Sequence, residues 1–507
     1  MVTVTGPLLQ FPARAAFIWY AALIAAGACL LKLPQSVVAG VEPLSWIDAV
    51  FTSTSACCVT GLSVRSAGND LSFFGQAVLL ILIQLGGIGI MTVTTFIVLR
   101  FGGRETLRHK AIVSQTLGGA RSDLRSTIWG VIRMVAACEA IGFVLLAARN
   151  LFDEFSSRSL WAALFHSISA YCNAGFGLRD SSLADYRGDA WVNFTIMGLI
   201  ISGGLGFPVI SDLLDNSRRG RRGRWESLTM HSKMMLLGSA ALLSLGAAAI
   251  LLLEWNNALV DMPLYEKLLV AGFQSTTPRT AGFETVPMAS LTNATLFVIM
   301  LLMLIGGGPC STAGGFKVST LMVMVHHAWS RFRGYRQVSL FRRSVPRETV
   351  DAALATSLLF TAVAAIALTA FLVVEQADAP HHASQSSALG AAFEVCSALG
   401  TVGLSTGITP HLSFAAKSIL IVLMFLGRLG PISVCKRGVE FLMRRCRSRD
   451  PLAVISSSSS KCSQSRVRMA QLPICLVLLC RDRRMDGSYT SISEALPASS
   501  THNGDAG

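Results

Sequence analysis

Long apolar segments alternate with shorter, half-apolar segments along most of the chain. Eight of the long segments can each form a helix that crosses a hydrocarbon core about 30 Å thick. The sequence therefore predicts eight membrane-spanning helices at residues 15–34, 73–100, 124–148, 190–212, 233–254, 293–325, 348–374 and 413–434.

A shorter segment lies between the two spans of each consecutive pair. These segments are too short to cross the hydrocarbon core, so we expect half-helices that enter the membrane and turn back. Each ends at a compact turn centred on Gly61, Gly175, Gly282 or Gly403. The four half-helices are predicted at residues 45–60, 159–174, 265–281 and 388–402.

Span, half-helix, glycine turn and span together form a unit that occurs four times. The pattern predicts an all-α membrane protein in which four such repeats surround a central pore. We place the repeats at residues 1–122, 123–231, 232–346 and 347–434. Residues 435–507 are basic and then serine-rich, so we expect a disordered tail there.

The composition agrees with a membrane protein. Only 14% of the residues are charged, whereas soluble proteins have about 25%, and the mean hydropathy is +0.55. The 12 cysteines are scattered, and no zinc spacing, catalytic triad or phosphate-binding loop is present. We therefore expect neither enzyme activity nor a cofactor.

Basic residues collect in the loops after spans two, four and six, at residues 104–121, 218–224 and 331–343. The positive-inside rule places such loops in the cytoplasm. We therefore expect both termini on the cytoplasmic side of the cytoplasmic (inner) membrane, with the glycine turns opening outward. These loops also account for the net charge of +14 without a nucleic-acid partner.

The glycine turns carry small residues, which allow an extended backbone with its carbonyl groups facing a common axis. Rings of carbonyl groups can replace the hydration shell of a potassium ion. One such turn is an ordinary helix end, but four at corresponding positions predict a selectivity filter for K⁺, with no other metal. Its expected residues are Val59, Thr60, Gly61, Asn173, Ala174, Gly175, Thr280, Ala281, Gly282, Thr401, Val402 and Gly403.

Span six contains a run of glycine, proline and small polar residues. Such residues break a helix, and the freed backbone groups then need other partners. We expect an irregular loop below the filter that acts as a gate; the alternative is a kink that lets helices pack closely. The residues concerned are Gly306, Gly307, Gly308, Pro309, Ser311, Thr312, Gly314 and Gly315.

Four charged residues within or beside the predicted spans stand out, and one of them, Glu139, is mid-span and needs a partner or water. Arg428 is midway along span eight, where an unpaired arginine costs roughly 2.5–3.5 kcal/mol. We expect it in an aqueous cavity, as part of the gate and a barrier to cations; the alternative is a side chain that snorkels to the interface. Arg279 and Glu394 flank the filter. They are expected to form a buried pair that supports it, and direct contact with the ion is the alternative.

Two further glycine runs, at residues 86–89 and 203–206, have another explanation. They lie within spans two and four. Small residues at these places let neighbouring helices approach closely. We therefore expect a packing role for them.

The motifs together resemble the Trk/Ktr/HKT superfamily of potassium transporters, most closely the bacterial Ktr-type membrane subunit. Residues 55–62, 172–176, 277–283 and 398–407 resemble its four filter signatures. Residues 307–317 resemble its intramembrane gating loop, and residues 427–431 its pore arginine motif. The resemblance covers about residues 10–434, and the chain begins directly with the first repeat, as in the Ktr type.

The resemblance implies potassium uptake through a gated pore, with sodium as a candidate second ion. It also implies a homodimer with one pore per subunit and a cytoplasmic ring of nucleotide-binding regulatory subunits that opens the gate. Two features depart from the family: Pro278 precedes the third filter signature, and apolar sequence stops at Val434, where the family's last span continues. A secondary cation transporter with alternating access is the alternative function.

Overall fold

The computed structural model describes residues 12–101, 124–150, 156–217, 224–335, 337–341, 343–376 and 381–430. The chain divides into two units, Met1–Leu442 and Met443–Gly507, and every described residue belongs to the first. The predicted tail at residues 435–507, the basic loop at 104–121 and most of the basic loop at 218–224 lie outside the described residues.

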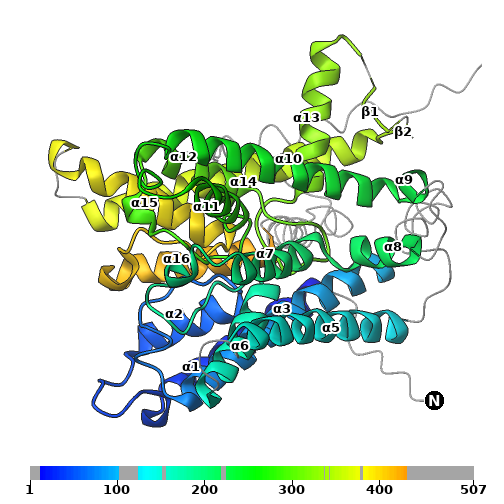
Figure 1. The fold of residues 1–507 in the computed structure, drawn as a ribbon. Coiled ribbons are helices and arrows are strands. Elements are labelled where there is room, and N and C mark those ends of the chain that lie inside the picture. The colour runs from blue at the N-terminus through cyan, green and yellow to red at the C-terminus, as the bar shows by residue number, and fades with distance from the viewer. Residues whose placement is uncertain are drawn as a thin grey trace, which may run out of the picture. The chain divides into compact units, whose positions relative to one another are not determined.

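Helices form almost all of the regular structure (Figure 1). In the first half they are α1 (Pro12–Leu31), η1 (Pro34–Ser36), α2 (Trp46–Cys57), α3 (Phe73–Phe101), α5 (Leu124–Asn150), α6 (Ser157–Tyr171), η2 (Ala184–Tyr186), α7 (Ala190–Leu205), α8 (Phe207–Ser217), α9 (Arg224–Ser227) and α10 (Met230–Leu253).

In the second half, the described residues also contain two short strands, β1 and β2, which pair antiparallel. The elements there are α11 (Leu264–Thr276), η3 (Met288–Ser290), α12 (Asn293–Leu304), α13 (Val318–Phe332), β1 (Ser339–Leu340), β2 (Arg343–Ser344), α14 (Arg347–Gln376), α15 (His381–Gly400), η4 (Thr409–His411) and α16 (Phe414–Leu429).

The helices pack in groups that follow the chain. Helices α1, α2 and α3 contact one another, as do α5, α6 and α7, and α14, α15 and α16; α10 contacts α11, α12 and α13. Each group also contacts the next: α3 packs on α5, α7 on α11, and α12 on α15. Because α16 packs on α2, the last group returns to the first and the sequence of groups closes.

Three short helices are attached to the preceding long helix in the same way. A serine hydroxyl of the short helix donates a hydrogen bond to a backbone carbonyl of the long helix, and a glycine three residues beyond that carbonyl faces the serine. The absence of a glycine side chain lets the helices approach closely. The bonds are Ser53 Oγ to Ile24 O (2.8 Å), Ser167 Oγ to Glu139 O (2.6 Å) and Ser275 Oγ to Leu243 O (2.7 Å).

Glycines also bring the long helices α3, α7 and α16 against the ends of the short helices. A methyl group on Gly86, Gly203 or Gly427 would overlap a backbone carbonyl oxygen. The three oxygens belong to Cys57, Tyr171 and Leu399, each four residues before a filter glycine. The prediction that the glycine runs at 86–89 and 203–206 permit close packing is confirmed.

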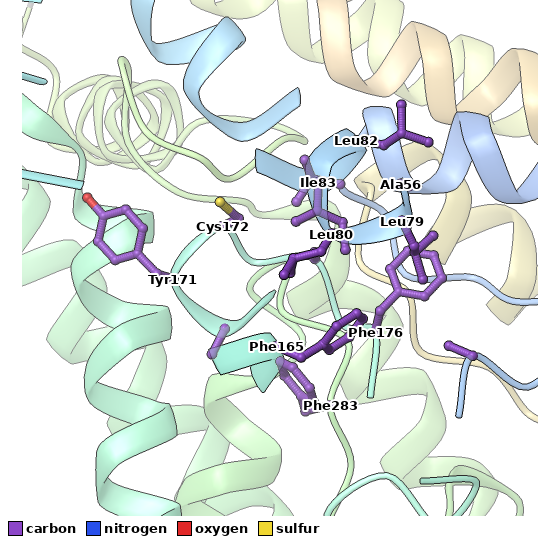
Figure 2. Close-up of a cluster of buried hydrophobic side chains, with 14 of the residues drawn as sticks. Ala56, Leu79, Leu80, Leu82, Ile83, Phe165, Tyr171, Cys172, Phe176 and Phe283 are labelled. Atoms are coloured by element: carbon purple, nitrogen blue, oxygen red, sulfur yellow. The ribbon is translucent and has the colours of Figure 1, made fainter. Parts of the chain in front are cut away.

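Large aromatic side chains fill the space beside the second glycine turn (Figure 2). Phe165 of α6, Phe176 after the turn and Phe283 after α11 gather there, and Leu79 of α3 belongs to the same buried cluster. This core therefore joins the first three helix groups, because its members come from all of them.

Two predicted spans are interrupted. The span predicted at residues 190–212 is wrong as a continuous helix, because α7 and α8 meet at an angle of 103°. Gly206 has a φ of +89° at the bend, and Pro208 follows it. The span predicted at residues 293–325 is broken by an irregular segment between α12 and α13, as its glycine content indicated.

Three described helices are long and apolar enough to cross a membrane: Ile128–Arg149, Met230–Leu253 and Arg347–Glu375. The bent pair α7–α8 would be a fourth if it counts as one span. These assignments follow from length and composition alone, so the full set of eight spans stays a prediction.

The tight packing of α7 can be tested by adding one methyl group. Gly203→Ala places a methyl group against Tyr171 O, and overpacking of this kind costs about 1–3 kcal/mol. Gly198→Ala is the matched control in the same helix, because no atom lies within 4 Å of the added group. We expect Gly203→Ala to lower the thermal unfolding temperature of the detergent-solubilised protein and Gly198→Ala to leave it unchanged or raise it. Equal unfolding temperatures in the two variants would contradict the packing.

Candidate functional site

The four glycine turns share one backbone conformation. In each turn the glycine has a positive φ, and so does the residue two positions before it: Val59 (55°), Asn173 (59°), Thr280 (70°) and Thr401 (53°). Positive φ is a genuine outlier for β-branched valine and threonine. Strain of this kind costs about 1–3 kcal/mol per residue and persists only where the surrounding structure enforces it, often at functional sites.

Hydrogen bonds to the end of the preceding helix hold these turns. Thr60 N donates to Ser55 O (2.8 Å), and Gly61 N donates to the Ser55 hydroxyl (3.1 Å). The fourth turn repeats this arrangement, because Gly403 N donates to the Ser397 hydroxyl (3.0 Å). One serine therefore binds two successive backbone groups of its turn, an arrangement that the sequence analysis missed.

The third turn differs from the others at the position of Pro278. Ala281 N donates to Thr277 O (2.9 Å), which lies four residues earlier in the chain. In the other three turns the equivalent N–H donates to the carbonyl oxygen five residues earlier. The Thr277 hydroxyl donates to Phe283 O. The departure noted at Pro278 thus appears as a changed hydrogen-bond pattern before an otherwise equivalent glycine.

The four glycines lie against one another in a closed ring. A methyl group on Gly61 would lie 2.6 Å from Ala174 O, one on Gly175 2.8 Å from Ala281 O, and one on Gly282 2.6 Å from Val402 O. The ring closes because a methyl group on Gly403 would overlap Thr60 O. Each glycine thus touches the carbonyl group that precedes the next glycine, in chain order. Sequence spacing predicted the four turns, and the structure brings the four glycines and the residue before each of them into contact at this ring. The other four predicted filter residues, Val59, Asn173, Thr280 and Thr401, come directly before these pairs in the chain.

Two hydroxyl groups in the turns are buried without a partner. Thr60 Oγ1 and Thr401 Oγ1 have no hydrogen-bond partner among the residues that the structure describes. A buried polar atom in this state is costly unless something else binds it. Neither threonine lines the cavity at the ring, so these oxygens by themselves do not identify an ion site.

A cavity of about 660 Å³ begins at the four glycines. Its walls come from the loops that follow the turns. Charged and titratable side chains line it, namely Asp48, Arg65, Asp70, Arg179, Asp180, Glu284, His411 and Lys417. The cavity gives a polar route from one side of the protein to the ring.

The segment between α12 and α13 lies against the ring. Gly306 N donates to Phe316 O (2.8 Å), so the two ends of the segment meet, and Gly308 N donates to Gly204 O (2.8 Å). A methyl group on Gly314 would overlap Thr401 Oγ1 of the fourth turn. The predicted irregular loop at residues 306–315 is therefore present beside the filter residues, and its role as a gate stays a prediction.

Thr312 attaches this loop to three other helices. Its backbone N–H donates to Gly203 O (3.2 Å) and its hydroxyl to Tyr171 O (3.2 Å). Its carbonyl oxygen accepts a hydrogen bond from Arg428. All three polar groups of Thr312 are thus engaged in the interior.

Arg428 is 4% exposed and contacts both the loop at residues 306–315 and helix α3. Nη1 donates to Thr312 O, and Nη2 donates to Gly86 O (3.0 Å), which also accepts a hydrogen bond from Tyr20 (2.7 Å). Within the described part of the chain, no carboxylate pairs with it. The side chain therefore binds inner backbone carbonyls and does not extend to the surface, so the snorkelling alternative does not apply.

The predicted pairing of Arg279 with Glu394 is wrong. Arg279 Nη2 donates to the Ser239 hydroxyl (2.9 Å), whereas Glu394 accepts hydrogen bonds from Ser405 Oγ (2.5 Å) and Thr409 Oγ1 (2.8 Å). Both side chains are buried, and each is bound by neutral groups. Each can still support its own filter turn, Arg279 within the third and Glu394 through the loop after the fourth.

A second carboxyl group lies behind the second turn. Gln84 Nε2 donates to Glu139 Oε2 (2.9 Å), and the Cys172 thiol approaches Glu139 Oε1 (3.7 Å). The sequence predicted only that Glu139, in the middle of its span, needs a partner or water. These three residues come from three different segments, so their spacing along the chain carried no signal of the cluster.

Comparison with known proteins agrees with this arrangement. Residues 20–438 match the TrkH family, described as cation transport protein. Ktr system potassium uptake protein B of Bacillus subtilis is 38% identical over 416 residues, which are 80% of this chain and 88% of that protein. Potassium/sodium uptake protein NtpJ of Enterococcus hirae is 33% identical over 414 residues, 81% of this chain and 89% of that protein.

A crystal structure of the potassium transporter TrkH from Vibrio parahaemolyticus has the same fold. Its TM-score is 0.68 at 18% sequence identity, and the match covers 85% of each chain. The resemblance found in the sequence is thus confirmed, as is the expectation of a transport protein rather than an enzyme. With residues 20–438 matched, this chain belongs to the TrkH family of cation transport proteins.

Proposed function

We propose that this protein takes up potassium ions across the cytoplasmic membrane through a gated pore. The ring of four glycine turns carries the proposal. Gly61, Gly175, Gly282 and Gly403 each contact the carbonyl group before the next glycine, so backbone oxygens from all four turns surround one axis. Such a ring suits a potassium ion that has shed its water.

The names of the relatives support the choice of ion. The Bacillus subtilis relative is a potassium uptake protein, and the name of the Enterococcus hirae relative includes sodium as well. Potassium is therefore the proposed transported ion, and sodium is the candidate second ion. No cofactor is proposed for the chain.

The proposed architecture has eight spans and four re-entrant half-helices in repeats at residues 1–122, 123–231, 232–346 and 347–434. The half-helices are α2, α6, α11 and α15. Their carboxyl ends lead directly into the glycine turns, where the partial negative charge of a helix end favours a cation. With the basic loops and both termini in the cytoplasm, the cavity above the ring opens outward.

The loop at residues 306–315 is proposed as the gate. It is non-helical, it contacts the fourth filter turn, and Arg428 binds its Thr312 carbonyl group. Arg428 is proposed to act both as a latch for this loop and as a positive charge that repels cations below the filter. The contacts of Arg428 add the latch to the barrier that the sequence suggested.

The family resemblance supplies the proposed partners. They are a second copy of the chain, with one pore in each, and a cytoplasmic ring of nucleotide-binding regulatory subunits that releases the loop. The surrounding lipid is the third partner.

Alternating access is the second candidate mechanism. The break between α12 and α13 and the 103° bend between α7 and α8 favour it, because secondary transporters use interrupted helices near their substrate site. Recording from single reconstituted proteins separates the mechanisms. Unitary currents support a pore, whereas slow flux without unitary currents supports alternating access.

The filter can be tested at Gly403. Gly403→Ser introduces a side chain at φ +92° and against Thr60 O. Because overpacking costs about 1–3 kcal/mol, we expect the apparent KM for potassium to rise roughly 10-fold or more and inhibition by sodium to increase. Gly407→Ser is the matched control, with φ +93° and no atom within 4 Å of the added group. Unchanged KM and sodium inhibition in Gly403→Ser would remove this turn from the filter.

The gate can be tested by shortening the loop. Deleting residues 309–313 removes Thr312 and its bonds, while the bond between Gly306 N and Phe316 O can still close the shortened segment. We expect potassium flux that no longer depends on the regulatory subunit. The measurement is potassium flux with and without that subunit. If a folded deletion variant still needs the subunit for its flux, the segment is a packing kink rather than a gate.

Arg428 can be tested with two substitutions. Arg428→Ala removes both the charge and two hydrogen bonds, each worth about 1.5–3 kcal/mol. Arg428→Lys keeps the charge but loses the guanidinium fork that reaches both carbonyls. If the latch dominates, both variants leak at least about 10-fold more than the wild type without the regulatory subunit. If the charge dominates, only Arg428→Ala gains flux. Wild-type flux in both variants is incompatible with either role.

A further inference from the structure

The residues two positions beyond the filter glycines form a second layer around the pore entrance. They are Ser63, Gly177, Glu284 and Ser405, and all four line the 660 Å³ cavity. In each repeat, one buried phenylalanine or leucine separates this residue from the filter glycine, so the four residues occupy equivalent positions. Of these four residues, Glu284 is the only one with a charged side chain.

The other members of this layer carry no charge. The Ser63 hydroxyl donates to Arg65 O, and the Ser405 hydroxyl donates to Glu394 Oε1 (2.5 Å). Gly177 has no side chain. The fourfold layer is therefore asymmetric, with its charge on the third repeat alone.

The backbone and one carboxyl oxygen of Glu284 are held in place. Glu284 N donates to the Ser182 hydroxyl (3.2 Å), and Leu183 N donates to Glu284 O (3.0 Å). Met288 N donates to Oε2 (3.2 Å). Oε1 has no hydrogen-bond partner among the described residues, although the side chain lines the cavity. One carboxyl oxygen thus anchors the group and the other is available to a ligand.

The cationic side chains that line the cavity are Arg65, Arg179 and Lys417. Arg179 pairs with Asp185 (2.9 Å), and Lys417 pairs with Asp48 (2.9 Å). In the part of the chain that the structure describes, no lysine or arginine lies within ion-pair distance of Glu284. When the carboxyl group is ionised, no ion pair with the described residues therefore neutralises it.

We propose that Glu284 forms an outer cation-binding site at the entrance of the filter, where it holds a monovalent cation before that ion enters the ring. This inference rests on the proposed function. A carboxylate two residues beyond Gly282 attracts any small cation without choosing between potassium and sodium, because selection needs the full set of ring carbonyls. Glu284 thus raises the concentration of cations at the filter entrance, and the glycine turns discriminate between potassium and sodium.

The test is the apparent KM for potassium uptake by the full chain in uptake-deficient cells. Burial raises the pKa of Glu284 to about 7, so the measurements are made at external pH 8.5, where the carboxyl group is ionised. Loss of one nearby charge should raise KM about threefold to tenfold in Glu284→Gln, with the maximal rate unchanged. The sodium-to-potassium preference should also stay unchanged.

Asp180→Asn is the matched control. Asp180 also lines the cavity, but both of its carboxyl oxygens accept hydrogen bonds, from Ser66 and from Asn69 (2.6 Å). We expect its KM to change less than that of Glu284→Gln. An equal or larger change in Asp180→Asn would show that the general charge of the cavity matters rather than one site, and would overturn the proposal.

A gain-of-charge variant covers the case in which Glu284→Gln does not accumulate in the membrane. Ser63→Glu adds a second carboxylate to the same layer, and we expect a lower KM. If Glu284→Gln takes up potassium with the wild-type KM, the outer site is overturned and the proposed pore is unaffected. If only Ser63→Glu accumulates, a wild-type KM in that variant has the same meaning. No saturable uptake by the wild-type chain contradicts the proposed function instead.

Discussion

Closure of the ring of glycine turns is the constraint on which the rest of the structure depends. Each turn places a residue and a glycine in the left-handed region, and at Val59, Thr280 and Thr401 the first residue is β-branched. Three such residues together carry several kcal/mol of strain, at about 1–3 kcal/mol each. Hydrogen bonds from the helix ends and contacts with the neighbouring turn hold them there. A single turn would therefore relax if its three neighbours were absent, so the site exists only in the assembled fold.

The third repeat lacks a tight helix contact that the other three repeats have, and the irregular loop at residues 306–315 belongs to this same repeat. Gly86, Gly203 and Gly427 bring their helices against the ends of three short helices. The corresponding position at the end of the third short helix is Pro278, and the helix that would pack there is interrupted between α12 and α13. One quarter of the ring thus lacks the tight helix contact, and the chain between α12 and α13 occupies the space below the filter instead.

Local features of the sequence predicted much of this arrangement. Segment lengths and glycine positions predicted the short helices, the four turns and the irregular loop, because each depends on residues close together in the chain. The pairing of Arg279 with Glu394 failed because several neutral partners were available, and spacing along the chain does not rank distant partners. The bend at Gly206 was missed because apolar composition continues through it. The role of Ser397 at the fourth turn was also hidden, since a serine in an apolar helix has many possible acceptors.

The three bonds of Thr312 have a consequence for the kinetics of the loop. Its N–H, hydroxyl and carbonyl groups are bound to α7, α6 and Arg428, respectively. A small outward shift would break all three bonds before any new partner is reached, so intermediate positions are the least stable ones. The observed position of the loop is therefore a well-defined minimum, because leaving it costs all three bonds at once. If this loop is the proposed gate, conduction through one protein would switch between off and on in discrete dwell periods, and the proposed regulatory subunit would change how long each period lasts without changing the size of the current.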